Sequence, residues 1–273
     1  IIALVGEMFG YCLTTATGFE KAFLLYGEGS NGKSVLLDVL QNLLTLQNIC
    51  SVSMSDLHKP FSRSSLKDKL VNISTELETE VMDTGYFKKI ISGDIIDAQF
   101  KFKDSFEFQP FCKLIFAMNK LPIVRDRSGG FYRRLILIPF DRVFTEREQD
   151  KELKVKLSKE LDGILQFALK GLKRLAENKE FTYSQKCNRL LNQYKLDSNP
   201  VEQFFVECIA QDENSSIATL DLYKHYRQYC LENGLNPINN SNFGKEVTKK
   251  YGDIKIRSST GNRPYIYKGL KLL

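Results

Sequence analysis

Hydrophobic and polar residues follow two periodicities in the first half of the chain. Apolar runs of strand length lie at 22–26, 70–74, 113–118 and 134–140, and apolar residues recur at helical spacing in 1–14, in 33–44 and around 86–91. Near-continuous apolar strands that alternate with helices are typical of a sheet with both faces covered. The pattern therefore predicts an α/β fold with a mainly parallel sheet.

Residues 98–108 show an alternating pattern instead. Ala98, Phe100 and Phe102 precede the polar sequence KDS, and Phe106 and Phe108 follow it. Alternation on both sides of a short polar turn predicts a β-hairpin. We expect Phe100 and Phe102 to pack at the base of this hairpin, and stacking on nucleic-acid bases is the alternative.

The remainder of the chain is mostly helical in pattern. Residues 150–195 have helical spacing and many charges, and the sequence DSNP at 197–200 has the composition of a linker. Three more helices are expected at 201–210, 220–233 and 243–250, followed by two short strands around a turn rich in Ser, Thr, Gly and Asn. Three helices and a hairpin are the plan of a winged helix.

The net charge of +6 is concentrated at one end of the chain. Residues 236–273 hold eight Lys or Arg and two acids, which accounts for the whole excess. Such clustering is typical of a nucleic-acid-binding domain, although a solvated basic face has the same composition. The residues expected to contact DNA here are Lys245, Lys249, Lys250, Arg257 and Arg263.

Composition argues against some other classes of protein. No apolar run approaches the roughly 18 residues that a membrane-spanning helix needs, so no membrane partner is expected. The six cysteines form no C-x-x-C pair and the chain has two histidines, so we expect no structural zinc and a reducing compartment. Residue 1 is Ile rather than Met, and we expect the chain to be part of a longer protein.

A glycine-rich loop connects the strand at 22–26 to the helix at 33–44. Its sequence, GEGSNGKS, has the pattern G-x-x-x-x-G-K-[ST]. A glycine turn before a helix aims several backbone N–H groups at one small volume, where a triphosphate is stabilised. We expect ATP to bind there, with Lys33 on its β- and γ-phosphates and the Ser34 hydroxyl as a ligand of Mg²⁺. The residues expected to bind the nucleotide are Gly27, Gly29, Asn31, Gly32, Lys33 and Ser34.

Hydrolysis also requires groups that position the attacking water. Glu76 follows the strand at 70–74, with Glu78 next on the same side of an extended chain, and Asn119 follows the strand at 113–118. Acids after strands are often solvated caps, and Asn119 before Pro122 also suits a turn. We predict that Glu76 and Asn119 are catalytic and that Ser34, Glu76 and Glu78 are candidate ligands of Mg²⁺.

Five motifs follow one another in the order GEGSNGKS, LVNISTELE, SGD leading to KFKDSFEFQP, LIFAMNKLP and GGFYRRLILIPF. This set resembles the superfamily 3 DNA helicases, in their phage, plasmid and poxvirus primase-helicase branch. The resemblance is close over 1–145 and looser beyond. It implies the end of an N-terminal helical region at 1–20, an AAA+-like P-loop ATPase domain at 21–197 and a winged-helix DNA-binding domain at 198–273.

The resemblance also implies roles for individual residues. Glu76 matches the catalytic acid and Asn119 the sensor of the γ-phosphate. Arg133 and Arg134 match a pair of which one arginine enters the site of the neighbouring subunit, and we favour Arg134 for this role. Relatives often have two adjacent acids where this chain has Thr75 and Glu76, so the assignment of the acids within 75–78 stays open.

In these helicases a hairpin before the sensor strand grips single-stranded DNA in the channel of a ring. Lys101 and Lys103 are the candidates here, because a lysine at a hairpin tip can bind phosphate without reading sequence. A solubilising sheet edge is the alternative explanation of these lysines.

The sequence therefore predicts an ATP-dependent DNA helicase of a phage, plasmid or genomic island. We expect a ring-shaped homo-oligomer, a hexamer by resemblance, in the cytoplasm of a bacterial host. The composition rich in Lys, Asn and Ile is similar to that of proteins of low-GC Gram-positive hosts. Together with the family resemblance, it suggests a replication initiator of a staphylococcal-type genomic island. Two other functions stay open: a non-translocating ATPase that loads or remodels proteins on DNA, and a DNA-binding module with a nucleotide switch.

Overall fold

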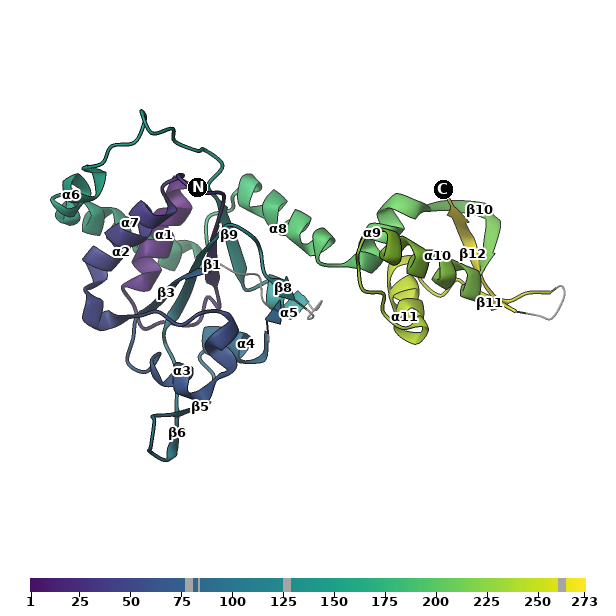
Figure 1. Cartoon of the computed structure of the whole chain (residues 1–273), viewed down its shortest axis with the longest axis horizontal. Helices are drawn as coiled ribbons and strands as arrows, with labels where there is room; N and C mark the ends of the chain where they lie inside the picture. The colour runs from purple at the N-terminus through teal and green to yellow at the C-terminus, as the bar shows by residue number, and fades with distance from the viewer. Residues whose placement is uncertain (77–80, 83, 125–128, 260–263) are drawn as a thin grey trace. The chain divides into compact units, whose positions relative to one another are not determined.

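A parallel sheet organises the first of two units in the computed structural model of the chain (Figure 1). The structure describes residues 1–76, 81–82, 84–124, 129–259 and 264–273. The two units are Ile1–Tyr194 and Lys195–Leu273, and each is described by itself.

Five parallel strands form the central sheet of the first unit, in the order β2-β3-β7-β1-β9. These strands are β1 (Ala22–Tyr26), β2 (Ile49–Cys50), β3 (Val71–Glu76), β7 (Lys113–Met118) and β9 (Leu135–Pro139). The mixed α/β fold with a mainly parallel sheet is the one that the apolar pattern predicts. Residues 22–26 and 113–118 begin and end as strands where their apolar runs do.

Successive residues of the central strands enter cores on opposite faces of the sheet. Phe23 and Leu25 pack with α1 (Ile2–Cys12), α2 (Lys33–Leu44) and α7 (Leu161–Asn178), which lie together on one side of the sheet in Figure 1. Leu24 packs with α4 (Thr84–Ser92), α5 (Gly129–Tyr132) and Tyr194 of α8 (Gln185–Asp197). Burial on both faces is the reason for the continuous apolar runs in these strands.

Shorter elements complete the first unit. They are the 3₁₀ helices η1 (Leu46–Asn48) and η2 (Ser55–His58), the helices α3 (Pro60–Ser64) and α6 (Leu153–Ser158), the parallel pair β4 (Val81–Met82) and β8 (Ile123–Val124), and the hairpin of β5 (Ile96–Gln99) and β6 (Ser105–Phe108). Within the described ranges, no helix is both long and apolar enough to cross a membrane.

Glycines allow α1 and α7 to approach closely. A Cβ added at Gly171 would lie 2.1 Å from the carbonyl carbon and oxygen of Gly6, and one at Gly10 would lie 2.5 Å from the Ala168 oxygen. Beside this crossing, the buried carboxylate of Glu7 accepts from Arg174 Nε at 2.6 Å. The crossing fixes α1, the segment directly before β1, against the sheet.

The second unit combines three helices with a three-stranded antiparallel sheet. Its elements are α9 (Pro200–Cys208), β10 (Ile209–Ala218), α10 (Thr219–Glu232), α11 (Asn240–Tyr251), β11 (Lys255–Arg257) and β12 (Tyr265–Leu272), with the strands in the order β10-β12-β11. Its core contains the stacked rings of Tyr226 and Phe243, whose centroids lie 4.6 Å apart.

Strand β10 is a correction to the sequence analysis. The helix expected at 201–210 ends at Cys208, and the next ten residues form β10, which pairs with β12 through 209–211 and 216–218. The register shifts between Gln211 and Ser216, and the polar sequence QDENSS in this region shows no clean alternation of apolar residues. Tertiary pairing with β12 therefore decides the conformation of a segment that has little strand propensity of its own.

Candidate functional site

The carboxyl ends of β1, β3 and β7 bring the predicted site residues to one edge of the sheet. Tyr26 and Glu76 both lie in register with Met118, so Gly27 and Asn119 continue from adjacent strands. Asn119 Oδ1 accepts from Lys33 Nζ at 3.2 Å. Residues from three separate parts of the sequence thus surround one point, as expected for the edge of a parallel α/β sheet.

The loop at 27–34 is held in a tight conformation by its own groups and by Phe140. Gly27 has a φ of +156°, and a Cβ there would lie 2.3 Å from the Phe140 oxygen, so only glycine fits. Asn31 Nδ2 donates to Phe140 O at 3.0 Å and to Glu28 O at 2.5 Å. The helix α2 begins at Lys33, so its first N–H groups point into the volume that the loop encloses.

Lys33 is buried at the centre of this loop. Nζ donates to Glu28 O at 2.8 Å, to Asn31 Oδ1 at 3.2 Å, and to Gly27 O and Asn119 Oδ1. These four acceptors, all in the described part of the chain, are neutral, and burial lowers the pKa of the lysine. A buried cation among neutral oxygens and helical N–H groups creates a region of positive potential suited to an anion.

Two neighbouring cavities open on this region. One of about 480 Å³ is lined by residues 29–35, by Thr75, Ala117 and Asn119, and by residues of the segment 144–153. The other, of about 510 Å³, extends past Asp38 and Cys50. Ser34 and Thr75 line both cavities. Volumes of this size are in the range of small-molecule sites.

The predicted catalytic and metal-binding acids are only partly covered by the structure. The backbone of Glu76 ends β3 at the site edge, and Glu78 lies outside the described residues. The hydroxyl of Ser34 is exposed and borders both cavities. Among the residues that can be described, no group of three or more His, Cys, Asp or Glu is arranged to hold a metal ion.

The two neighbouring arginines have different environments. Arg134 is buried and donates to Gly130 O at 2.7 Å and to Ser92 Oγ at 2.8 Å, and it lies 2.9 Å from Glu20. The side chain of Arg133 is 67% exposed, and its contact to Glu20 is longer, at 3.9 Å. The expectation that favours Arg134 for contact with a neighbouring subunit is therefore at odds with the geometry, which favours Arg133.

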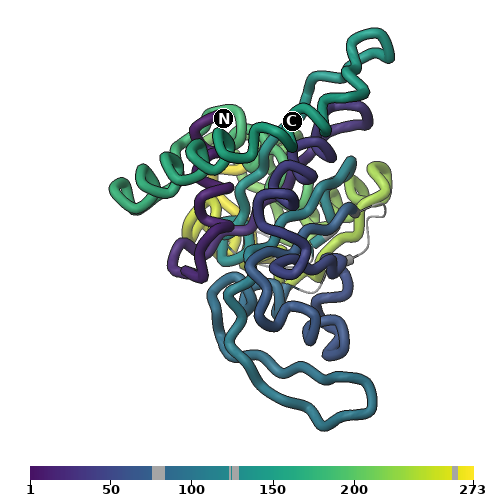
Figure 2. The backbone as a smooth tube through the Cα atoms, turned by 90° about the vertical axis from the view of Figure 1, so that its left-hand side faces the viewer, coloured from purple at the N-terminus to yellow at the C-terminus, as the bar shows by residue number. Residues whose placement is uncertain are grey.

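The β5–β6 hairpin projects from the first unit (Figures 1 and 2). Lys101 and Lys103 are exposed at its tip, as predicted. The Phe100 ring stacks on Phe106 with centroids 4.9 Å apart, but Phe102 is fully exposed, with a φ of 63°. The expectation that Phe102 packs at the hairpin base is therefore wrong. A bulky residue in the left-handed region is strained, and such strain is common at functional sites.

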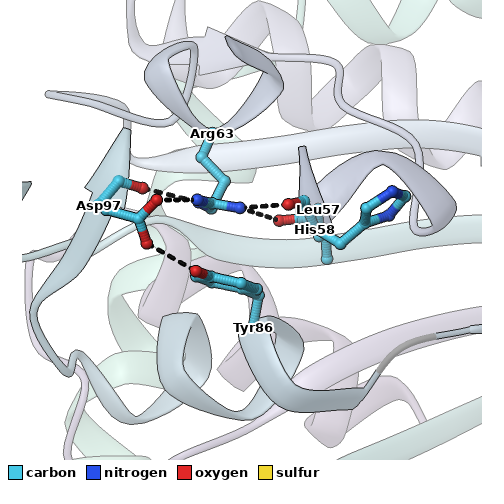
Figure 3. Close-up of polar contacts among 5 residues, drawn as sticks. All are labelled: Leu57, His58, Arg63, Tyr86 and Asp97. Carbon is cyan, nitrogen blue, oxygen red and sulfur yellow. Dashed lines mark hydrogen bonds and ion pairs between the residues drawn. The ribbon is translucent and has the colours of Figure 1, made fainter. Parts of the chain in front are cut away.

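A buried arginine anchors the base of this hairpin (Figure 3). Arg63 Nε donates to Asp97 O at 2.7 Å, another guanidinium nitrogen forms an ion pair with the Asp97 carboxylate, and a third donates to Leu57 O and His58 O. Tyr86 donates to Asp97 Oδ1 at 2.6 Å and lies under the guanidinium, 3.7 Å from its carbon. The Tyr86 hydrogen bond and the Arg63 charge lower the pKa of Asp97. Sequence analysis missed this cluster, because Arg63 and Asp97 are 34 residues apart and its members share no motif.

The basic residues of the second unit also divide into two groups. Lys245 and Lys249 are exposed on α11, where Lys249 forms an ion pair of 3.6 Å with Glu246 of the same helix, whereas Lys250 forms an ion pair with Glu202 of α9 and lies over the Phe205 ring. This structural role counts against the expectation that Lys250 contacts DNA.

The strands β11 and β12 carry further cations. Arg257, a predicted DNA contact, lies over the Tyr265 ring at 5.3 Å. Lys255, which sequence analysis did not single out, lies over the same ring at 4.6 Å. Arg263 is outside the described residues.

The fold and the site define a mixed α/β domain with a buried lysine at the edge of its sheet, followed by a winged-helix-like unit. Residues 25–134 match the model of a family of unknown function, DUF5906. Residues 199–273 match the model of the RFX DNA-binding domain. In this second region the chain is 34% identical over 59 residues to the RFX-like transcription factor daf-19 of Caenorhabditis elegans, covering 21% of the chain and 7% of that protein.

Two of the similar proteins are viral. Over 259 residues the chain is 23% identical to the protein named "Putative helicase L207/L206" of Acanthamoeba polyphaga mimivirus, covering 81% of the chain and 26% of that protein. It is 27% identical over 138 residues to "Putative helicase 121R" of Invertebrate iridescent virus 3, covering 46% of the chain and 15% of the relative. The chain thus spans about a quarter or less of the length of these relatives.

A solved structure shares the fold. The A form apo structure of the NrS-1 C terminal region superposes with a TM-score of 0.59 at 13% identity, covering 98% of this chain and 71% of that one.

Proposed function

We propose that this chain is the motor part of an ATP-dependent DNA helicase that acts in the replication of a virus, phage, plasmid or genomic island. The observation that carries the proposal is the position of Lys33, buried among neutral oxygens at the sheet edge and bonded to Asn119. The viral relatives named helicases and the RFX-like region support the same function.

At this site the triphosphate of ATP lies in the loop at 27–34. Lys33 and the first N–H groups of α2 stabilise the charge of its β- and γ-oxygens. Asn119, already hydrogen-bonded to Lys33, orients the attacking water, and Glu76, the last residue of β3, is the catalytic acid. The exposed hydroxyl of Ser34 fits a ligand of Mg²⁺, which neutralises phosphate charge when bound.

The site is completed by an arginine from a neighbouring copy of the chain. Arg133 has the exposed side chain that this role requires, whereas Arg134 is engaged within its own subunit. A guanidinium supplied across an interface stabilises transition-state charge only in the assembled oligomer, which ties hydrolysis to a ring, by resemblance a hexamer.

DNA is held at two places. The β5–β6 hairpin grips single-stranded DNA, with Lys101 and Lys103 on phosphates and the exposed Phe102 ring stacked on a base. Lys245, Lys249, Lys255 and Arg257 of the second unit contact the backbone of duplex DNA.

The first test is ATP hydrolysis at several protein concentrations, with and without single-stranded DNA, together with displacement of a labelled strand from a forked duplex. Lys33→Ala is compared with Lys170→Ala, which removes an exposed lysine from α7. We expect hydrolysis that rises more than linearly with concentration, responds to DNA and is lost only in Lys33→Ala. Hydrolysis without strand displacement would instead support a remodelling ATPase, and negligible turnover would support a nucleotide switch.

A further inference from the structure

The segment 140–153 leaves the edge strand β9 and returns over the loop at 27–34. Phe140 N–H donates to Tyr26 O at 2.7 Å, and Phe144 N–H donates to Ser30 O at 2.8 Å. Farther along, Lys154 at the start of α6 forms an ion pair with Asp38 of α2. The segment is therefore fixed to the residue before the loop, to the middle of the loop and to the helix that follows it.

This segment forms the second wall of the 480 Å³ cavity. Phe144, Glu148 and Leu153 line this cavity together with residues 149–151. The lining thus includes the buried cation Lys33 and the hydroxyl residue Ser34, and also the apolar residues Phe144, Leu153 and Val35. A nucleotide needs both kinds of group, since a charged phosphate chain is joined to a flat aromatic base.

The acids of the wall do not oppose an anionic ligand. Glu148 accepts from Thr145 N at 2.9 Å and from Thr145 Oγ1 at 3.0 Å, and it pairs with Arg142 at 3.3 Å. Asp150 accepts from Lys156 at 2.7 Å and from Glu152 N at 3.0 Å. Both carboxylates are thus engaged by groups of the segment or of α6.

We propose that the segment 144–153 is the nucleobase wall of the nucleotide site, and that the Phe144 ring packs on the base of a bound nucleoside triphosphate. The inference deepens the proposed function and rests on it. Phe144 is half-buried, with the Arg142 guanidinium 4.7 Å from its ring centre. This contact holds the ring in place before a ligand arrives, which reduces the entropy lost on binding.

The test separates the base from the phosphates. Dissociation constants for Mg²⁺-ATP and for inorganic tripolyphosphate with Mg²⁺ are measured on the full chain, for the wild type, Phe144→Ala, Phe144→Tyr and Val143→Ala. Val143 is an exposed neighbour that does not line the cavity, so its variant is the matched control. Unfolding temperatures of all four proteins establish that each is folded.

We expect Phe144→Ala to weaken ATP binding about tenfold, because an aromatic stacking contact is lost, and to leave tripolyphosphate binding within about twofold. Phe144→Tyr keeps the ring and the affinity. Equal weakening of both ligands in Phe144→Ala, or no weakening of either, would overturn the nucleobase wall while the phosphate site stands. A wild type that binds neither ligand would overturn the proposed function itself.

Discussion

Lys33 and Asn119, 86 positions apart in the sequence, are joined by a hydrogen bond of 3.2 Å between Nζ and Oδ1. The bond connects the start of α2 with the end of β7 across the site edge. Because Asn119 is exposed while Lys33 is buried, the amide can exchange this bond for one to a phosphate or a water without disturbing the core.

Removal of the Asn119 amide should therefore lower turnover without lowering stability. Asn119→Ala is expected to reduce kcat for ATP about a hundredfold, as loss of a polar group that stabilises the transition state does, with little change in KM. Lys120→Ala, a change at the next exposed residue, is the control. Steady-state kinetics measure kcat and KM for each protein, and an unchanged kcat in Asn119→Ala would mean that Asn119 has no role in catalysis.

Substitutions of Arg133 and Arg134 should have different effects on the stability of the fold, and mixing two inactive variants should test the shared site. Arg134→Ala breaks contacts to Ser92, Gly130 and Glu20, so we expect a loss of about 2 kcal/mol in the free energy of unfolding. Arg133→Ala should abolish hydrolysis while the denaturation midpoint stays the same. Mixing inactive Arg133→Ala with inactive Lys33→Ala should restore partial activity. At some interfaces of a mixed oligomer, the Arg133→Ala subunit supplies Lys33 and the Lys33→Ala subunit supplies Arg133. No recovery on mixing would argue against a shared site.

Replacing Phe102 by glycine should stabilise the fold and weaken the binding of single-stranded DNA. Glycine accepts a φ of 63° without strain, so Phe102→Gly should raise the free energy of unfolding, by up to about 1 kcal/mol. The same change should weaken binding of a fluorescent single-stranded oligonucleotide about tenfold through loss of stacking. Fluorescence anisotropy at a fixed salt concentration measures this effect. Unaltered affinity would leave the lysines as the only contacts of the tip.

Lys113 should make stability depend on alkaline pH. Burial lowers its pKa to about 8 from the usual 10.5, and its ammonium donates to Phe111 O at 2.9 Å and lies 4.8 Å from the Tyr11 ring. Between these two values the unfolded chain holds more protons than the folded one, so this residue makes the free energy of unfolding rise with pH.

Denaturant titrations of wild type and Lys113→Met measure this contribution. The wild type should gain about 2 kcal/mol relative to the variant between about pH 7 and about pH 10. Cys12, whose pKa burial raises to about 12, acts in the opposite direction above about pH 9 in both proteins. A difference in the free energy of unfolding that stays constant across this range would mean that the pKa of Lys113 is not lowered in the folded chain.

The crossing of α1 and α7 predicts opposite effects for two glycines of one helix. A methyl group at Gly171 has no room, so Gly171→Ala should lower the free energy of unfolding by about 2 to 3 kcal/mol. Gly163 has nothing within 4 Å of an added Cβ, and Gly163→Ala should raise it by up to about 1 kcal/mol through helix propensity. Chemical denaturation of both variants tests the packing of the helices, since equal effects would mean that the close approach is absent.

Local patterns in the sequence determined the elements that carry their own signal. The strand at 22–26, the loop at 27–34 and the helix at 33–44 form a contiguous unit whose glycines, lysine and apolar spacing all specify the same geometry. The concentration of basic residues near the C-terminus likewise needs no structure to be recognised. The alternation around KDS predicted the β5–β6 hairpin, although not that its turn places Phe102 outward.

Tertiary structure alone decided which residues of a similar type are free to act. Arg133 and Arg134 are adjacent and chemically identical, and both contact Glu20, yet Arg134 alone is buried and donates to Ser92 and Gly130. Pairing with β12 made a strand of the polar residues 209–218, and a return of the chain after β9 placed Phe144 against Ser30. These outcomes depend on groups far apart in sequence, whose meeting is set by the packing of the whole domain rather than by any local periodicity.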